Sequence, residues 1–360
     1  MLVGVPTEIK PQEFRVGLTP EAAREYIASG HQVIVQSGAG LGIDKSDDDY
    51  RAIGAEIVDS AEEVFARADM VVKVKEPQPN EWVQLREGQI LFTYLHLAPD
   101  PDQAKGLMDA GVSAVAYETV TGPGGGLPLL APMSEVAGRL SIEAGAHALR
   151  ASNGGRGTLM GGVPGVLPAK VVVLGGGVVG TQAARMAVGL GAYVEIFDKS
   201  LPRLRQLDEM FQGRASTRYS TAGTIEQALA EADVVIGAVL IPGASAPHLV
   251  PREDLKLMKN RAVLVDVAID QGGCFETSKP TTHENPTYEV DGIIHYCVAN
   301  MPGAVPLTSS YALNNATLPF GLALANKGIA ACDEDPHLKP GLNVHQGKIV
   351  NEAVAESLGF

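Results

Sequence analysis

The stretch VVVLGGGVVGTQAARMAVGLGAYVEIFD, residues 171–198, decides the fold of one half of the chain. It reads as a buried strand, a glycine turn, a helix and a second strand, with Gly175, Gly177 and Gly180 in the spacing GxGxxG. The first glycine permits a tight turn, the second lets the backbone approach a pyrophosphate, and the third lets helix and strand pack closely. The N-terminus of the helix attracts phosphates. The pattern therefore predicts a dinucleotide-binding βαβ unit.

An acidic residue ends the second strand of this unit. Asp198 lies 18 residues after Gly180. A carboxylate at this position accepts hydrogen bonds from the ribose 2′-hydroxyl and repels a 2′-phosphate, so we predict NAD rather than NADP. Lys199 and Arg203 lie nearby, and a basic side chain could accommodate the extra phosphate, so the sequence does not strictly exclude NADP.

Composition limits the classes of protein to consider. The chain has 360 residues, 41 glycines and a formal net charge of -14. Its length predicts two α/β domains, and its charge disfavours nucleic acid and anionic membranes as partners. No apolar span reaches the roughly 18 residues of a membrane helix, and the three cysteines form no CxxC pair. We expect a cytoplasmic protein that binds neither nucleic acid nor membrane.

Short β-branched runs alternate with helical patterns in both halves of the chain, as in parallel sheets buried on both faces. The predicted strands are residues 2–5, 32–35, 70–74, 90–95 and 113–117, and then 170–174, 193–197, 233–239, 262–269 and 292–300. This alternation predicts an α/β protein with two Rossmann-like doubly wound domains and an inter-domain cleft, joined by long helices.

The domain boundaries are expected where the composition changes. Glycine-rich residues 121–132 suggest the first boundary, and Ser134 is the expected N-cap of the helix that follows, up to Arg150. After Pro306 the sequence reads as a helix with one proline kink, and no strong strand pattern returns. We therefore predict a substrate and catalytic domain from residues 1–130 plus 306–360, and an NAD-binding Rossmann domain from residues 131–305.

Polar residues follow several of the predicted strands. Lys75, His96, Asp270 and Asn300 each end a strand run, and Arg15 lies in the loop after the first strand. Ligands of doubly wound sheets bind beyond the carboxyl ends of the strands, so these are candidate site residues. Taken singly, each also fits a solvated charge or a cap on a turn. If all of these residues had only such roles, the predicted nucleotide site would have no catalytic or substrate-binding residues near it.

The residue types suggest a reaction. A nicotinamide accepts hydride from a carbon that bears an amine or a hydroxyl, and a group with a pKa near neutrality must take a proton. Arg15 and Lys75 suit a substrate carboxylate, His96 suits the acid/base role, and Asp270 could orient a water or relay a proton. Tyr94 and Asn300 would complete the hydrogen bonds to the substrate. These residues indicate a small carboxylate substrate but do not identify it.

Seven stretches, in order, resemble the alanine dehydrogenase family, which also contains pyridine nucleotide transhydrogenase. They are MLVGVPTEIK…EFRVGLTP, VKVKEPQ, LFTYLHLA, PMSEVAGR, LGGGVVG, VDVAIDQGGC and CVANMPGAVP. The resemblance implies reversible oxidative deamination of L-alanine to pyruvate and ammonia with NAD, in a homo-oligomer usually described as a hexamer. By the family pattern Arg15 and Lys75 bind the substrate, and His96 and Asp270 are catalytic.

The same resemblance implies a set of residues that line the cofactor. They are Ser134, Gly175, Gly177, Val178, Val179, Gly180, Asp198, Arg203, Ser220, Val239, Leu240, Val267, Ala268, Ile269, Asp270, Lys279, Val298, Ala299, Asn300 and Met301. Some relatives bind a metal through an acid and a histidine of the C-terminal helix. The matching positions here are Ala323 and Lys327, so we predict no metal site.

The sequence is also compatible with two other functions. The soluble nucleotide-binding subunit of a proton-translocating transhydrogenase shares the fold and would pass hydride to a second nucleotide. A saccharopine-type amino-acid dehydrogenase would use the same two-domain plan for a larger substrate.

Overall fold

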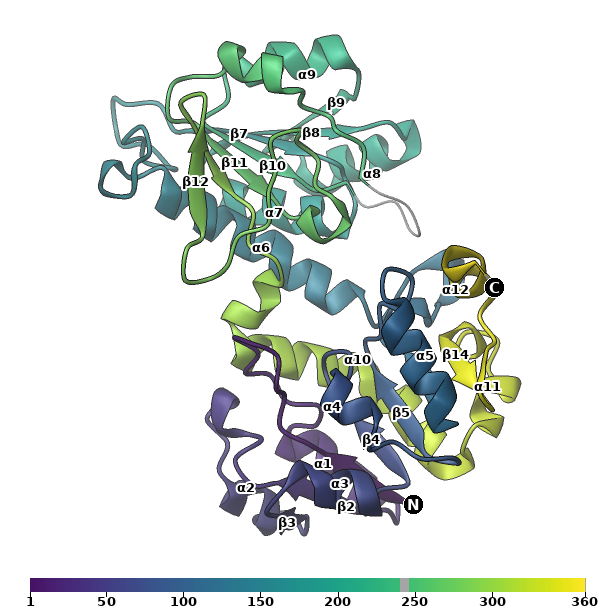
Figure 1. Ribbon diagram of the computed structural model, residues 1–360. Coiled ribbons are helices and arrows are strands. Elements are labelled where there is room, and N and C mark those ends of the chain that lie inside the picture. The colour runs from purple at the N-terminus through teal and green to yellow at the C-terminus, as the bar shows by residue number, and fades with distance from the viewer. Residues whose placement is uncertain (240–245, 360) are drawn as a thin grey trace. The chain divides into compact units, whose positions relative to one another are not determined.

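The computed structural model describes residues 1–239 and 246–359 (Figure 1). The chain divides into two compact units. Unit 1 consists of Met1–Met133 and Val305–Phe360, and unit 2 consists of Ser134–Ala304. The first division falls inside helix α6 (Ala131–Ala148), and the second lies directly before helix α10 (Pro306–Lys327).

Unit 1 is built on an eight-stranded sheet in the order β15-β14-β6-β5-β4-β1-β2-β3. Its parallel strands are β1 (Leu2–Val5), β2 (Gln32–Gln36), β3 (Glu56–Val58), β4 (Met70–Val72), β5 (Ile90–Thr93) and β6 (Ser113–Ala116). β14 (Leu342–His345) pairs antiparallel with β6, and β15 (Lys348–Ile349) pairs antiparallel with β14. The parallel part has the strand order of a Rossmann sheet, and its order reverses between β1 and β4.

Several helices of unit 1 begin at side-chain caps. Thr19, Ser60 and Asp100 each accept a hydrogen bond from a backbone N–H in the first turn that follows. The helices are α1 (Pro20–Ala28), α2 (Asp47–Ala52), α3 (Ala61–Arg67), α4 (Pro79–Trp82), α5 (Pro101–Ala110), α10, α11 (Ala330–Glu334) and α12 (Glu352–Leu358).

Unit 2 is built on a seven-stranded sheet in the order β12-β13-β11-β10-β7-β8-β9. Six strands run parallel: β7 (Lys170–Leu174), β8 (Tyr193–Asp198), β9 (Ser216–Tyr219), β10 (Val234–Gly237), β11 (Val263–Asp266) and β13 (Ile293–Tyr296). β12 (Thr287–Val290) is an antiparallel edge strand. The order again reverses once, between β7 and β10, which is where a doubly wound sheet binds its ligand.

Both faces of the second sheet are buried. Along β7, Val171 and Val173 belong to one apolar cluster, and Val172 and Leu174 belong to another. This alternation follows from the twofold period of a strand, and it explains the uninterrupted apolar run in the sequence. The helices are α6, α7 (Val178–Gly189), α8 (Leu201–Phe211) and α9 (Ala222–Leu229).

The prediction of an α/β protein with two Rossmann-like, doubly wound sheets is confirmed. Several details were wrong. The last sixty residues do contain strands, and β14 adds to the edge of the first sheet. Strands β3, β9 and β12 were missed because they have only three or four residues, with exposed or half-buried positions that break the apolar pattern.

The predicted start of the long helix was also wrong. α6 begins at Ala131, so Ser134 lies inside its first turns and is not its N-cap. Pro132 does not prevent the earlier start, because the first N–H groups of a helix have no intrahelical partner. The predicted strands 262–269 and 292–300 end earlier, at Asp266 and Tyr296. Asp270 and Asn300 therefore lie in the turns beyond the strands.

Candidate active site

The predicted substrate residues of unit 1 lie at one edge of its sheet. Arg15 follows β1, Lys75 follows β4 and His96 follows β5, and these three strands are neighbours. Figure 1 shows β4 and β5 side by side. Since parallel strands end at the same edge, the sheet gathers these loops beside its switch point between β1 and β4.

Arg15 is held rigidly inside unit 1. Its side chain is 2% exposed, and its Nε and Nη2 donate to the two carboxylate oxygens of Glu13 at 2.6 and 2.5 Å. Nη1 lies 3.1 Å from the sulfur of Met133. Burial alone would lower the pKa of Arg15, but the hydrogen bonds and charge of Glu13 raise it. Glu13 therefore fixes the plane of a permanently charged guanidinium, as bidentate recognition of a carboxylate requires.

A buried ion cluster fixes the backbone that carries Lys75. Lys73 is fully buried, with its Nζ 3.0 Å from Glu8 and 2.9 Å from Glu81. Glu8 also accepts from the N–H groups of Val74 at 2.6 Å and Lys75 at 3.4 Å. Burial raises the pKa of Glu8, although the charge of Lys73 offsets part of the shift. Separating one member of this cluster from the others would leave an uncompensated buried charge, so the backbone that carries Lys75 is strongly constrained.

His96 and Tyr94 form a stacked pair. Their ring centroids are 5.7 Å apart and the rings are inclined by 6°. The side chain of His96 is 46% exposed, whereas Tyr94 is buried and its hydroxyl donates to the carbonyl of Leu129 at 2.6 Å. Burial raises the pKa of Tyr94, so its hydroxyl stays protonated. The structure therefore leaves Tyr94 able to accept, but not to donate, a hydrogen bond to a substrate; its substrate role stays a prediction.

The glycine turn of unit 2 is held by two residues that are predicted to line the cofactor, Asp198 and Arg203. Asp198 accepts from the N–H of Gly176 at 2.9 Å and of Ser200 at 2.8 Å. Arg203 donates from Nε to the carbonyl of Gly176 at 2.6 Å and from Nη2 to Thr181 at 2.7 Å. Both side chains thus lie at the turn that precedes α7, whose N-terminus attracts phosphate.

Asp270 lies in a loop that a neighbouring acid organises. It is exposed, in the turn Ile269–Gln271 after β11. Asp266, which is fully buried, accepts from three backbone N–H groups and one hydroxyl of the same loop. The donors are Ala268 at 3.1 Å, Cys274 at 2.7 Å, Phe275 at 3.3 Å and the Ser278 hydroxyl at 2.5 Å. One carboxylate therefore closes the loop that carries Asp270.

We predict that Asp266→Asn destabilises unit 2. The amide group would present N–H atoms to donors, so at least one buried donor would lose its acceptor, at a cost of about 1–3 kcal/mol. The thermal unfolding midpoint, compared with that of the exposed control Asp208→Asn, measures the effect. An unchanged midpoint in Asp266→Asn would show that the loop does not depend on this carboxylate.

The other predicted cofactor residues mostly follow parallel strands of unit 2. Ser220, after β9, is buried and donates its N–H to the Asp198 carbonyl at 3.0 Å. Lys279 is exposed, and Asn300 has a left-handed φ of 57°. The set after β7, β10, β11 and β13 comprises Gly175, Gly177, Val178, Val179, Gly180, Val239, Val267, Ala268, Ile269, Val298, Ala299 and Met301. Leu240 lies outside the described residues. Cofactor contacts for all of these remain predictions.

Sequence reasoning missed the acids that hold the site. Glu8 accepts from the N–H of Lys75, and Glu13 binds the guanidinium of Arg15. Glu118 accepts from the N–H of His96, and Asp266 closes the loop that carries Asp270. Glu118 is the first charged residue after β6, so the strand-end rule that selected His96 could also have found it. Glu8 is likewise the first charged residue after β1, so the same rule could have selected it. Glu13 carries no such signal, because it is an ordinary loop acid until the fold buries it.

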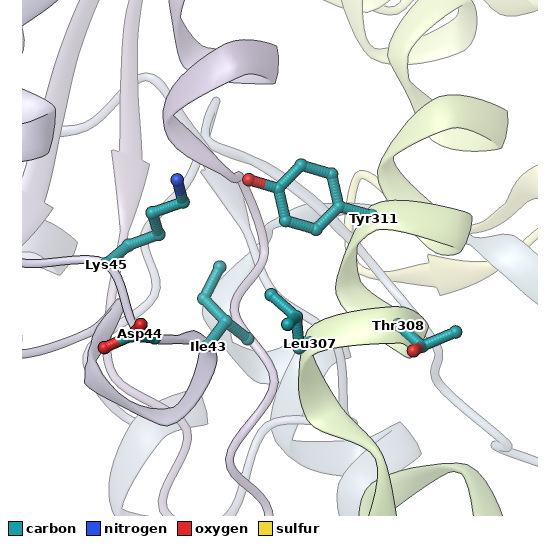
Figure 2. Close-up of a pocket in the computed structure, with 6 residues that line it drawn as sticks. All are labelled: Ile43, Asp44, Lys45, Leu307, Thr308 and Tyr311. Atoms are coloured by element: carbon teal, nitrogen blue, oxygen red, sulfur yellow. The ribbon is translucent and has the colours of Figure 1, made fainter.

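A hollow of about 480 Å³ lies elsewhere in unit 1, between the segment 43–45 and the start of α10 (Figure 2). The Tyr311 hydroxyl donates to Glu21 at 2.9 Å, and Lys45 lies 3.7 Å from Glu21. None of the predicted site residues lines it. Two of its polar groups, Lys45 and Tyr311, are thus already engaged with Glu21, which argues against a ligand site.

Within residues 1–239 and 246–359, no three His, Cys, Asp or Glu side chains gather as a metal site would require. In the same residues, no helix has the length and apolar character needed to cross a membrane. Ala323 and Lys327 occupy α10, where Lys327 pairs with Glu334. The absence of a resident metal remains a prediction.

The fold and the glycine turn define the class of this protein as a dinucleotide-binding protein with a second doubly wound unit. Comparison with known proteins narrows the class. Residues 4–137 match the family described as "Alanine dehydrogenase/PNT, N-terminal domain", and residues 141–352 match "Alanine dehydrogenase/PNT, C-terminal domain". The chain belongs to the alanine dehydrogenase/PNT family.

Individual relatives agree with this assignment. Alanine dehydrogenase of Halomonas elongata is 58% identical over 100% of this chain and 97% of its own length. A solved L-alanine dehydrogenase structure is 53% identical with a TM-score of 0.97, covering 100% of this chain and 99% of the other. A transhydrogenase structure from Sinorhizobium meliloti is 26% identical with a TM-score of 0.83, covering 98% and 100%. The predicted family resemblance is confirmed.

Proposed function

We propose that this protein catalyses the reversible, NAD-dependent oxidative deamination of L-alanine to pyruvate and ammonia. The observation that carries the proposal is the full-length identity of 58% with an alanine dehydrogenase, compared with 26% for the transhydrogenase. The residues fit the reaction. In unit 1, Arg15, Lys75 and His96 follow three adjacent strands, and in unit 2 the glycine turn follows β7 at the reversal of the sheet, with Asp198 bound to its backbone.

Arg15 and Lys75 are proposed to hold the substrate carboxylate. Arg15 is pre-oriented by Glu13, so little conformational entropy is lost when it binds. Lys75 is half-buried, with its Nζ 3.8 Å from Glu76, and supplies a second positive charge. Asn300 is proposed to complete the hydrogen bonds to the substrate.

The proposed chemistry uses His96 and Asp270. NAD supplies the acceptor for a hydride. Alanine binds with a neutral amine. The α-carbon loses a hydride, that is, a hydrogen with both electrons of the C–H bond, and an iminium forms between this carbon and the nitrogen. A water molecule adds to that carbon and gives its proton to His96, forming a carbinolamine. In the collapse to pyruvate the C–N bond breaks: protonated His96 returns its proton to the amine nitrogen, which leaves as ammonia, and the hydroxyl proton passes to solvent with the help of Asp270 as the carbonyl forms.

A direct assay tests the proposal. Alanine and NAD should produce NADH and pyruvate in equal amounts, and a panel of amino acids should give alanine the highest kcat/KM. Hydride transfer between two nucleotides with no response to alanine would instead indicate a transhydrogenase subunit. A preference for a saccharopine-like substrate would overturn the substrate assignment.

We predict that Asp198→Asn widens the cofactor preference. Asparagine keeps one oxygen that can accept from the Gly176 N–H, while its amide group then faces the exposed Ser200 N–H, and it removes the charge that repels a 2′-phosphate. The kcat/KM ratio of NADP to NAD is expected to rise about tenfold, which corresponds to roughly 1.4 kcal/mol. Asp208→Asn, on the exposed side of α8, is the matched control. A ratio unchanged from that control would rule out charge at position 198 as the discriminating element.

We also propose a homo-oligomer, a hexamer by family resemblance, located in the cytoplasm. An exposed apolar hairpin in unit 2 supports association: Leu159, Val163, Val166 and Leu167 are 52–74% exposed, and Val163 pairs with Val166. Exposed apolar side chains that gather on one surface mark interaction sites, and these four come from a single short segment of the chain. Free, buried Cys274, Cys297 and Cys332 suit a reducing compartment.

Leu167→Glu tests the role of this hairpin. A charge in the centre of a subunit interface should lower the oligomeric mass measured by light scattering, because the carboxylate would lose its hydration on association. An unchanged mass would place the interface elsewhere. A wild-type protein that is monomeric at micromolar concentration would contradict the oligomer itself.

A further inference from the structure

The backbone at His96 has a conformation that needs external support. Its φ is 49°, in the left-handed region that a residue with a side chain seldom adopts. Such residues persist where the surrounding structure holds them, and they cluster at functional sites. The groups that hold the backbone at His96 therefore also determine where its imidazole ring lies.

The support comes from a carboxylate on the neighbouring strand end. Glu118 lies in the turn Tyr117–Thr119, directly after β6, which pairs with β5. Its Oε1 accepts from the N–H of His96 at 2.5 Å, and both of its oxygens lie 3.2 Å from the N–H of Leu95. Two successive N–H groups beside a left-handed residue form a concavity suited to an anion, and Glu118 fills it.

The opposite side of the same peptide segment is also fixed. Gln103 of α5 is fully buried and donates to the Leu95 carbonyl at 2.9 Å. Tyr117 anchors the turn that carries Glu118, because its hydroxyl donates to the Lys73 carbonyl at 3.0 Å. The carboxylate of Glu118 therefore has a defined position from which to hold the backbone at His96.

The imidazole ring lies beside the Glu118 carboxylate and packs against Tyr94. Its Nδ1 lies 3.9 Å from Oε1 of Glu118, and its face stacks on Tyr94. Tyr94 is backed by the ring of Tyr117, with centroids 5.0 Å apart and planes at 79°. The ring edge that carries Nε2 thus lies opposite the Glu118 side, on a side chain that is nearly half exposed.

We infer that Glu118 is a positioning residue for His96: its carboxylate binds the Leu95 and His96 amides and thereby holds the imidazole in the geometry for proton transfer. The inference rests on the proposed function, in which His96 exchanges the proton. Glu118 itself touches neither substrate nor cofactor in this scheme.

Four variants test the inference in the alanine and NAD assay. Glu118→Ala removes both acceptors, whereas Glu118→Gln retains one oxygen that can accept from both amides. Glu87→Ala changes an exposed acid in the turn before β5 and is the matched control. His96→Asn reports whether the histidine matters at all. NADH binding and the thermal midpoint are measured for each variant.

Glu118→Ala is expected to lower kcat about 100-fold, because misplacing a catalytic group by about 1 Å costs that much. The KM for alanine should stay within about threefold, and NADH binding within about twofold, of the control. Glu118→Gln should recover most of the lost kcat. A role in general stability would produce neither this rescue nor a decrease in kcat with an almost unchanged KM.

Three results would overturn the inference. The first is a Glu118→Ala enzyme as active as the Glu87→Ala control while His96→Asn is inactive. The second is a Glu118→Gln enzyme as impaired as Glu118→Ala. The third is a parallel loss of kcat, NADH binding and thermal midpoint. Full turnover by His96→Asn would instead overturn the role of His96 in the proposed function.

Discussion

Replacing His96 by alanine is expected to lower kcat for alanine oxidation about 10³-fold, because general acid–base groups contribute about 10²–10⁴-fold. Hydride loss creates an electrophilic carbon, and the water that attacks it must lose a proton in the same step. His96 is the titratable residue at the end of β5, stacked on Tyr94 and 46% exposed, so solvent can exchange its proton. Initial rates of NADH formation at saturating alanine and NAD measure the loss.

NADH binding provides the control for this variant. The glycine turn belongs to unit 2, and His96 belongs to unit 1. The dissociation constant of NADH, measured by fluorescence, should therefore stay within about twofold of the wild type, far below the tenfold change that 1.4 kcal/mol produces. Undiminished turnover by His96→Ala would remove the histidine from the mechanism. Loss of turnover together with loss of NADH binding would indicate a folding defect.

The parts of this protein that the sequence predicted well are those that depend on local pattern. The run from Val171 to Asp198 specifies strand, turn, helix and strand by glycine spacing and apolar period, and the structure has all four. The strand-end rule likewise placed Lys75 and His96 in loops at one edge of the first sheet. Each of these inferences needs only residues close in sequence.

The parts that could not be predicted depend on contacts between distant segments. β14 has two buried residues and gains its stability by pairing with β6, more than 220 positions earlier. Lys73 reads as a charge that interrupts a strand, and only the fold reveals Glu8 and Glu81 beside it. Asp266 reads as part of a strand, yet it closes a loop. No local pattern contains this information.

Replacing glycines of the nucleotide turn is expected to separate folding from binding. Gly177 has a φ of −68°, which alanine adopts easily, and an added Cβ would meet no protein atom within 4 Å. Gly180 differs, because a Cβ there would lie 1.8 Å from the carbonyl oxygen of Gly175. The open space at Gly177 is where a pyrophosphate approaches the backbone, whereas Gly180 is where the helix meets the strand.

Gly177→Ala should therefore weaken NADH binding at least about tenfold and leave the thermal midpoint unchanged, since the methyl group would occupy space that the pyrophosphate needs. Gly180→Ala should lower both binding and the midpoint, because the backbone must shift to relieve the clash and overpacking costs about 1–3 kcal/mol or more. Gly189→Ala, near the end of α7, also adds a Cβ without protein contacts and is the matched control.

The comparison of Gly177→Ala with Gly189→Ala is the decisive one, because both variants should fold equally well. If NADH binds to both with the same affinity, the backbone at Gly177 is not the phosphate-binding surface, and the cofactor must bind to another part of unit 2. If only Gly177→Ala binds weakly, the loss comes from the place where the methyl group stands and not from an altered fold. A Gly180→Ala protein that was as stable as the wild type would require the Gly175 carbonyl to move away without cost, against the close packing of α7 on β7.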